Sequence, residues 1–192
     1  MATAPTEDDL FLRTRRMTLR HLRPGDVFDL QSLGRNARVA EALLDAPVAD
    51  IASAAALVET SARVRRTRPG LGIWRADDAG GFLGFFSLMA ELDPGEVEIG
   101  TRLLPRAWGR GYALEGGEAL CRHAFDTLGL EALVGMCDPA NRSVPPLLAR
   151  LGFRPDGDAE QFGRPAVRMR LDRCDWRGVR RRAQRAGSAT GA

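Results

Sequence analysis

The segment Arg-Ala-Trp-Gly-Arg-Gly-Tyr-Ala-Leu-Glu, at residues 106–115, constrains the fold of this chain more than any other. It follows an alternating apolar segment typical of a strand and precedes a long segment with helical periodicity. Two glycines one residue apart let the backbone turn tightly between strand and helix. Because the first turn of a helix has unpaired N–H donors and the positive end of the dipole, the segment predicts a cradle for a phosphate or pyrophosphate.

The glycine spacing alone is weak evidence, since Gly-x-Gly also occurs at residues 70–72, before a strand, where no helix N-terminus follows. A Walker phosphate loop requires a lysine, and all 28 basic residues of this chain are arginines. A dinucleotide-binding loop requires a third glycine where Leu114 stands, within a parallel strand–helix–strand unit. The prediction of a phosphate cradle therefore rests on the position of the two glycines between a strand and a helix.

Length and composition favour one globular domain, because 192 residues with 44% hydrophobic content can bury a sizeable core. The chain has no apolar stretch of the roughly 18 residues that a membrane helix needs, and residues 1–10 lack a secretory signal. We therefore expect a cytoplasmic protein without membrane contact. Cys121, Cys137 and Cys174 fit neither a disulfide framework nor a zinc site, so no metal is expected.

The net charge of +3 is concentrated at the C-terminal end of the chain. Residues 173–192 contain six arginines and one acid, Asp175, which leaves 22 basic and 24 acidic residues elsewhere. We therefore divide the chain into a domain at residues 11–178 and a basic, disordered tail at 179–192. The tail is expected to be solvated, with a contact to RNA or the ribosome as the alternative.

Hydrophobic periodicity predicts a mixed α/β domain with a mostly antiparallel sheet. We expect strands at 17–23, 71–75, 82–91, 96–104, 131–137 and 166–171, with turns at 77–81 and 93–95. We expect four helices: one that begins at residue 24, one that follows a cap at residue 50, one at 112–128 and one at 141–151. Between them, we expect a loop or broken helix at 36–50, and after the last helix a loop at 154–165.

Residues 98–115 resemble the acetyl-CoA motif of the GNAT superfamily of N-acetyltransferases. Asp-Pro-Ala-Asn at 138–141, followed by Leu-Gly-Phe at 151–153, is similar to the second motif of the branch that acetylates ribosomal-protein N-termini, the Rim type. The likeness spans about residues 11–178. It implies helices on both faces of the sheet and a splay between the two central strands, with the thioester in the gap.

The resemblance also implies which residues contact acetyl-CoA. Backbone N–H groups of 106–112 would hold the pyrophosphate, Leu103 and Leu104 would lie beside the pantetheine arm, and Asn141 would hydrogen-bond the cofactor. Gly116 and Gly117, each costing a helix about 1 kcal/mol relative to alanine, indicate a close approach of cofactor or sheet. The expected cofactor-binding residues are Leu103, Leu104, Arg106, Trp108, Gly109, Arg110, Gly111, Tyr112, Ala113, Asn141 and Ser143.

Acetyl transfer to an amine needs a base, and Glu98 on the central strand is the candidate, acting directly or through a water. Strand alternation places Glu96 on the same face as a reserve, and a structural carboxylate is the alternative role for Glu98. Leu148 and Val144 stand where family members often carry tyrosine and serine, so the general acid is unassigned. A thiol with a reference pKa of about 8.5 leaves readily without one.

These residues predict an acetyl-CoA-dependent N-acetyltransferase that works by direct attack in a ternary complex, as a monomer or homodimer. An α-amine is neutral at pH 7 roughly 300-fold more often than a lysine amine, which favours a protein or peptide N-terminus as acceptor. A small-molecule amine acetyltransferase and a non-catalytic CoA-binding module are the alternatives. The acceptor pocket is expected from residues 36–50 and 154–164, whose acids are Asp45, Asp50, Asp156, Asp158 and Glu160.

Overall fold

The computed structural model describes residues 10–90 and 96–176 of the chain. Within them, eight strands form one sheet in the order β1-β2-β3-β4-β5-β6-β8-β7. The strands are β1 Leu10–Arg13, β2 Thr18–His21, β3 Gly72–Asp78, β4 Gly81–Ala90, β5 Val97–Leu103, β6 Ala132–Cys137, β7 Arg154–Gln161 and β8 Arg164–Asp172. Neighbouring strands are antiparallel except β5 and β6, which are parallel.

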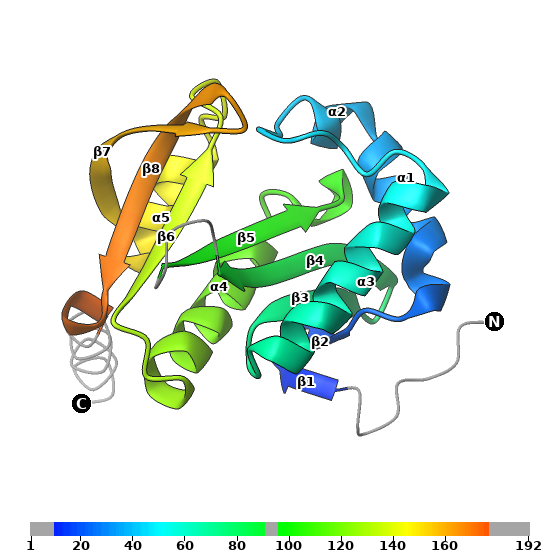
Figure 1. Ribbon diagram of the computed structural model, residues 1–192, viewed down its shortest axis with the longest axis horizontal. Coiled ribbons are helices and arrows are strands. Elements are labelled where there is room, and N and C mark those ends of the chain that lie inside the picture. Colours follow the sequence, from blue (N-terminus) through cyan, green and yellow to red (C-terminus); the bar gives the residue numbers. More distant parts are fainter. Residues whose placement is uncertain (1–9, 91–95, 177–192) are drawn as a thin grey trace, which may run out of the picture.

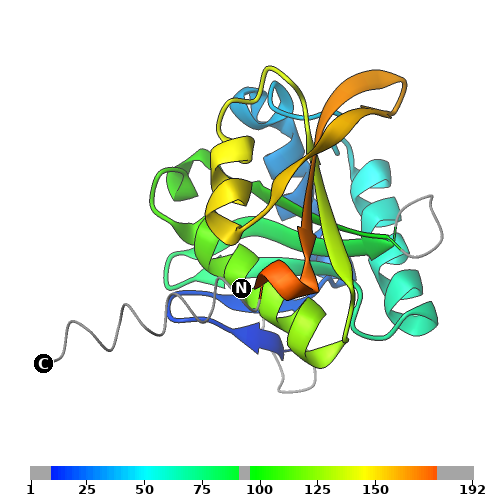
Figure 2. The same cartoon turned by 90° about the vertical axis from the view of Figure 1, so that its left-hand side faces the viewer.

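Helices cover both faces of this sheet (Figures 1 and 2). The helices α1 and α3 lie on one face, and α4 and α5 lie on the other. The α-helices are α1 Val27–Arg35, α2 Ala37–Ala40, α3 Ile51–Thr67, α4 Tyr112–Arg122 and α5 Val144–Leu151, joined by the short 3-10 helices η2 Pro24–Asp26 and η3 Pro105–Ala107 and by a π-helical turn, η4 His123–Thr127. Among the described helices, none combines the length and the apolar composition needed to cross a bilayer.

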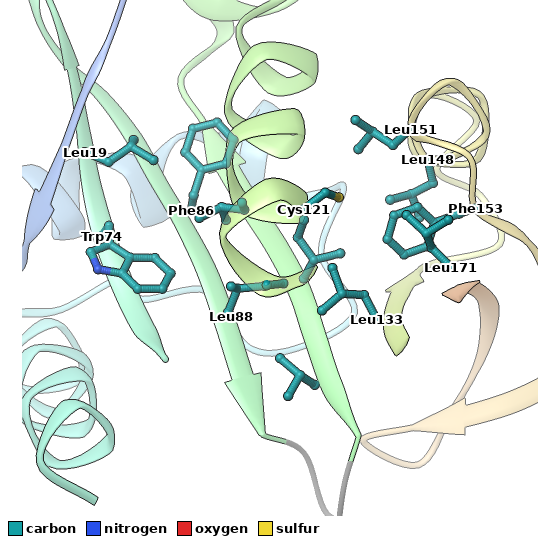
Figure 3. Packing of buried hydrophobic residues seen from close by; sticks show 14 of the residues in the cluster. Leu19, Trp74, Phe86, Leu88, Cys121, Leu133, Leu148, Leu151, Phe153 and Leu171 are labelled. Atoms are coloured by element: carbon teal, nitrogen blue, oxygen red, sulfur yellow. The ribbon is translucent and has the colours of Figure 1, made fainter. Parts of the chain in front are cut away.

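Strand β4 shows how alternation builds the two layers. Phe86 and Leu88 belong to the cluster that packs against α4, whereas Phe85 and Met89 belong to the cluster beneath α1 and α3. Figure 3 shows Phe86 and Leu88 on the side of the sheet that carries Cys121 of α4. Successive residues of a strand point to opposite faces, so one central strand supplies both cores.

The two central strands separate, as the family resemblance implied. Between β5 and β6 one paired position joins the described residues, Glu98 opposite Val134. Figure 1 shows the two strands diverging toward their C-terminal ends. The predicted mixed sheet, with helices on both faces and a central splay, is confirmed.

A buried ionic cluster fastens the start of α1 to β2 and β3. Asp26 is 4% exposed and accepts hydrogen bonds from Arg20 at 2.6 and 2.8 Å, from Arg75 at 3.0 Å and from the Arg23 backbone N–H at 2.7 Å. Burial alone would raise the pKa of Asp26, but these hydrogen bonds and the two guanidinium charges hold that pKa below its ordinary value. The cluster therefore depends on the ionised carboxylate.

Two sequence-based expectations about elements are wrong. Residues 154–165 are not a loop: β7 pairs with β8 there, with a register shift between Pro155 and Asp158 around the left-handed Gly157. None of the β7 side chains is buried, so the strand has no hydrophobic periodicity to detect. The strand β1 was also missed, because four residues are too few to show a period.

Other boundaries shift by a few residues. Strand β3 continues to Asp78, which shortens the expected turn at 77–81, and α5 begins at Val144 rather than at Asn141. Residues 36–50 contain only the single helical turn α2, as a broken helix would. The turn at 93–95 and the basic tail at 179–192 lie outside the described residues.

Candidate active site

A cavity of about 690 Å³ lies where β5 and β6 part. Its wall includes the loop between β5 and α4, the face of β4 and β5 under α2, the start of α5 and the turn between β7 and β8. This volume is within the range of small-molecule sites in proteins. The predicted base, Glu98, lies near the start of β5, and the predicted phosphate loop follows the end of that strand. Both line the cavity.

The glycine loop, residues 105–111, has the backbone that the sequence predicts. Gly109 and Gly111 adopt positive φ values of 69° and 78°, and Gly111 is the N-cap of α4. A Cβ at Gly109 would meet nothing within 4 Å, so this glycine is needed for its backbone angle rather than for space. The first turn of α4 supplies N–H groups without intrahelical partners beside the cavity.

Arg16, between β1 and β2, braces the glycine loop from one side. Its Nε and backbone N–H donate to the two carboxylate oxygens of Glu115 at 2.6 and 2.8 Å, and its Nη1 donates to the Arg110 carbonyl at 2.8 Å. Burial would raise the pKa of Glu115, but hydrogen bonds from Thr14 and Arg16 outweigh it and lower that pKa. Glu115 thus supports the start of α4.

Asp78, at the end of β3, braces the loop from the other side. It accepts hydrogen bonds from Arg106 at 3.2 and 3.3 Å and from the Tyr112 hydroxyl at 2.8 Å. Burial would raise the pKa of Asp78, whereas these two donors lower it. The sequence indicated only a turn at this position, and neither Asp78 nor Arg16 carried a signal of its own.

Seven of the residues expected to contact the cofactor line the cavity, and four do not. Leu104 packs under α1 and α3, and its N–H donates to Leu83 at 2.8 Å. The side chains of Arg106 and Tyr112 engage Asp78, and Arg110 is exposed. The residues in the lining are Leu103, Trp108, Gly109, Gly111, Ala113, Asn141 and Ser143.

Glu98 and Glu96 differ in their surroundings: Glu98 lies within β5, whereas Glu96 directly precedes the strand. Glu98 lines the cavity, opposite Met89 on β4, and its Oε2 accepts a hydrogen bond of 2.9 Å from Gln161 Nε2. Glu96 lies outside the lining, and its Oε1 accepts hydrogen bonds from Arg168 at 2.8 Å and Arg170 at 3.2 Å. Only Glu98 is placed to meet a ligand in the cavity.

Asn141 joins the start of α5 to the segment after α2. Its Nδ2 donates to the Ala42 carbonyl at 3.2 Å, and its Oδ1 accepts from the Ser143 hydroxyl at 2.8 Å. Leu148, in place of a family tyrosine, is 6% exposed and packs in the core. Hydroxyl groups do reach the cavity, on Ser87, Thr101 and Ser143, and sequence analysis identified only the last of these.

The glycines inside α4 serve packing. A Cβ at Gly116 would lie 2.2 Å from the Phe86 ring, and one at Gly117 would lie 2.7 Å from Leu151 Cδ1. Because both positions face side chains of the core, the close approach is that of α4 to the sheet and to α5, not to a cofactor.

The far end of the cavity is closed by contacts between distant segments. Arg164 donates to the Leu44 carbonyl at 3.0 Å and to Asp138 at 2.6 Å, which ties the β7–β8 turn to the segment after α2. Of the five acids in the segments expected to form the acceptor pocket, one lines the cavity: Asp45, which pairs with Arg102. Asp50 caps α3, Asp156 pairs with Arg168, and Asp158 and Glu160 are exposed.

Most of the chain that forms the loop, the splay and the cavity matches the model of a known family. The model of the acetyltransferase (GNAT) domain matches residues 16–154. The chain belongs to the GNAT family of acetyltransferases. Membership gives the reaction class, acetyl-CoA-dependent transfer of an acetyl group to an amine, and makes an amine-bearing molecule the second substrate.

Relatives identified by sequence include two proteins named for acetyl transfer. The chain is 32% identical over 93 residues to the FsC-acetyl coenzyme A-N(2)-transacetylase of Aspergillus fumigatus, a match that covers 44% of this chain and 40% of that protein. It therefore spans less than half the length of this relative. It is 27% identical over 162 residues to the uncharacterized N-acetyltransferase p20 of Bacillus licheniformis, covering 82% and 90% of the two chains.

Solved structures share the fold. An acetyltransferase from Agrobacterium tumefaciens is similar with a TM-score of 0.73 and 26% identity, over 89% of this chain and 96% of that one. A ribosomal-protein-S5-alanine acetyltransferase from Vibrio fischeri (TM-score 0.71, 13% identity, 86% and 97% covered) and a spermidine N-acetyltransferase from Vibrio cholerae (0.68, 20%, 84% and 98%) also match. The last two names differ in acceptor, so the acceptor of the GNAT protein described here must be argued from its own residues.

Proposed function

We propose that this GNAT protein acetylates the N-terminal α-amine of a peptide or protein, by direct attack of the amine within a ternary complex. The observation that carries the proposal is the position of Glu98. Its carboxylate lines the cavity at the point where β5 and β6 part, on the strand that leads into the glycine loop. A base at this point lies between a cosubstrate held by the loop and an amine entering from the α2 side.

On the cosubstrate side, backbone N–H groups of residues 106–112 hold the pyrophosphate of acetyl-CoA. Leu103 and Ala113 flank the pantetheine arm, and Trp108, Asn141 and Ser143 complete the wall. The left-handed glycines and the open space at Gly109 fit a phosphate group. Acetyl-CoA supplies an activated acyl group with a thiolate that leaves readily.

On the acceptor side, Glu98 takes the proton that the amine loses as its nitrogen bonds to the acetyl carbon and the carbon–sulfur bond breaks. Gln161 holds one carboxylate oxygen and thereby orients the other. The thiolate takes its proton from solvent. A positioned base of this kind contributes about 100-fold to 10,000-fold in rate.

The charges of the cavity favour a monocationic amine over a polyamine. Among the described residues in its lining, the acids are Asp45 and Glu98, and Asp45 is neutralised by Arg102. A polyamine brings several positive charges into the site and finds no further carboxylate to pair with them. An α-amine brings one, and roughly a tenth of its molecules are already neutral at pH 7.

The test is thiol release from acetyl-CoA with an acceptor panel: peptides with free N-termini, the same peptides with blocked N-termini but free lysines, and spermidine. We expect release with free N-termini and little with the other two. Faster release with spermidine or with the blocked lysine peptides would contradict the proposal. Tight CoA binding without acceptor-dependent release would instead favour a non-catalytic module.

Because the cysteines Cys121 and Cys137 are free thiols, we place the reaction in a reducing compartment such as the cytoplasm.

A further inference from the structure

Beyond Glu98 the cavity continues as an apolar chamber beneath α2 and α3. We define the chamber by six side chains that line the same cavity as Glu98: Val39, Leu44, Leu57, Ile73, Phe85 and Met89. They come from α2, the segment after it, α3, β3 and β4. Four of the six, including Ile73 and Phe85, are buried in the fold. None carries a charge.

The register of the sheet places this chamber next to the base. Met89 lies opposite Glu98, and Ser87 lies opposite Gly100, two residues further along β5. Ile73 of β3 lies opposite Ser87, so Gly100, Ser87 and Ile73 form one row across three strands. With strands about 4.8 Å apart, the row extends about 10 Å from the central strand.

Gly100, the first residue of this row, has no side chain to obstruct the row. A Cβ at this position would lie 2.5 Å from the Ser87 hydroxyl oxygen, so glycine makes room for the Ser87 side chain and places no side chain of its own between Glu98 and the row. Phe85 and Met89 flank the row on β4, while Val39, Leu44 and Leu57 cover it from the helical side. A group attached to the carbon that bears the amine can therefore extend from Glu98 across β4 toward β3.

We infer that the chamber receives a large apolar side chain on the carbon next to the acceptor amine, such as leucine, methionine or phenylalanine at the first position of a peptide. This inference rests on the proposed function, because it takes the amine to be bound at Glu98. A charged side chain would lose its hydration among these six residues, and the charged pair of Asp45 and Arg102, which borders Phe85, is already satisfied by its own contact. A small side chain would leave the chamber unfilled.

The first experiment measures kcat/KM for thiol release with peptides that differ only in their first residue. We expect Phe and Leu peptides to exceed the Gly peptide by at least about tenfold, the effect of burying one large apolar side chain. Lys at the first position should do no better than Gly. Equal values across the series, or a preference for Gly, Ser or Lys, would overturn the inference.

The second experiment fills the chamber. Leu57→Trp adds bulk from α3, and we expect it to lower the Phe-to-Gly ratio of kcat/KM about tenfold. Ile51→Trp is the matched control: it makes a similar change on the exposed first turn of the same helix, outside the lining, and should keep the wild-type ratio. A Leu57→Trp protein that retains the wild-type ratio would contradict the inference that the chamber receives the first side chain. If this variant does not fold, the peptide series on the wild type tests the same inference.

The two proposals fail in different ways. If free peptides are acetylated at rates independent of their first residue, the chamber is wrong and the proposed function stands. If no peptide is acetylated, 2-phenylethylamine and ethylamine provide the same comparison without a peptide chain. A rate advantage of at least about tenfold for 2-phenylethylamine would then support the chamber while the peptide acceptor is abandoned.

Discussion

The two ends of the cavity are built in different ways. The glycine-loop end is mainly one contiguous segment, residues 105–115, held in place by Arg16 and Asp78, and Asn141 and Ser143 before α5 complete its wall. The acceptor end is assembled from α2, α3, three strands and the β7–β8 turn, which are far apart in the sequence. Cosubstrate binding thus depends on a local backbone conformation, whereas acceptor binding depends on the packing of the whole sheet face.

The largest effect on the acceptor end should come from Asp26→Asn, which removes the most buried carboxylate that Arg20 and Arg75 share. The two arginines are left to the more exposed Asp77 and Asp29. We expect the free energy of unfolding to fall by about 3–5 kcal/mol, as when one partner of a buried ion pair is removed. Urea unfolding measures this change. Since the cluster fastens α1, which leads into α2, the KM for a peptide should rise more than the Kd for CoA.

The contribution of Asp26 to the free energy of unfolding depends on pH. The pKa of Asp26 is lowered by folding, so its contribution to stability is complete above its unfolded pKa of about 3.9 and is lost as the pH falls toward the folded value. The stability difference between wild type and Asp26→Asn should therefore be constant near neutral pH and shrink below about pH 4. A difference that grows on acidification would contradict the role given to the ionised carboxylate.

At the glycine-loop end, Gly109→Val should raise the Kd for CoA at least about tenfold in a calorimetric titration. A branched residue at a φ of 69° is strained by about 1–2 kcal/mol and will distort the loop. Gly157→Val is the control, because Gly157 has a φ of 78° and similar open space but lies in β7, outside the lining. If both variants bind CoA as the wild type does, the loop is not the phosphate cradle.

Removing the contact between Glu115 and Arg16, which braces the glycine loop, should have a smaller effect on the Kd for CoA. Glu115→Gln removes the charge that holds Arg16, and we expect the Kd for CoA to rise about fivefold, equivalent to about 1 kcal/mol. Glu118→Gln, one turn away on the exposed side of α4, should leave it unchanged. A fivefold change in both variants would point to a general charge effect instead of a brace.

The smallest effect should be that of Arg164→Gln at the acceptor end. Its side chain is 53% exposed, so its ion pair with Asp138 is worth at most about 1 kcal/mol. We expect the KM for a peptide to rise about twofold to threefold while the Kd for CoA stays the same. A change in CoA affinity alone would mean that the two ends are not separable in this way.

The contrast between the two ends also explains how much the sequence could predict. The loop, the strand that carries Glu98 and the helix predicted at 112–128 follow from local signals: two glycines one residue apart, strand alternation and a helical period. The splay and the two-faced coverage came from the family resemblance, whose motifs lie in the same contiguous segment.

The missed features depend on long-range pairing. Arg16 and Glu115 are 99 residues apart, and nothing local selects one arginine among 28 as the brace. Strand β7 has polar residues on both faces and exists because β8 lies beside it. The apolar chamber needs the register of three strands, which periodicity alone does not determine.

The central claim is that Glu98 is the base, and two glutamine substitutions, two residues apart in the chain, test it most directly. In steady-state thiol-release assays with a free N-terminal peptide, Glu98→Gln should lower kcat at least about 100-fold with little change in the Kd for CoA. Glu96→Gln, on the same face of the chain but paired with Arg168 outside the cavity, should stay within a few fold of the wild type. Wild-type turnover by Glu98→Gln, or an equal loss in both variants, would contradict the account.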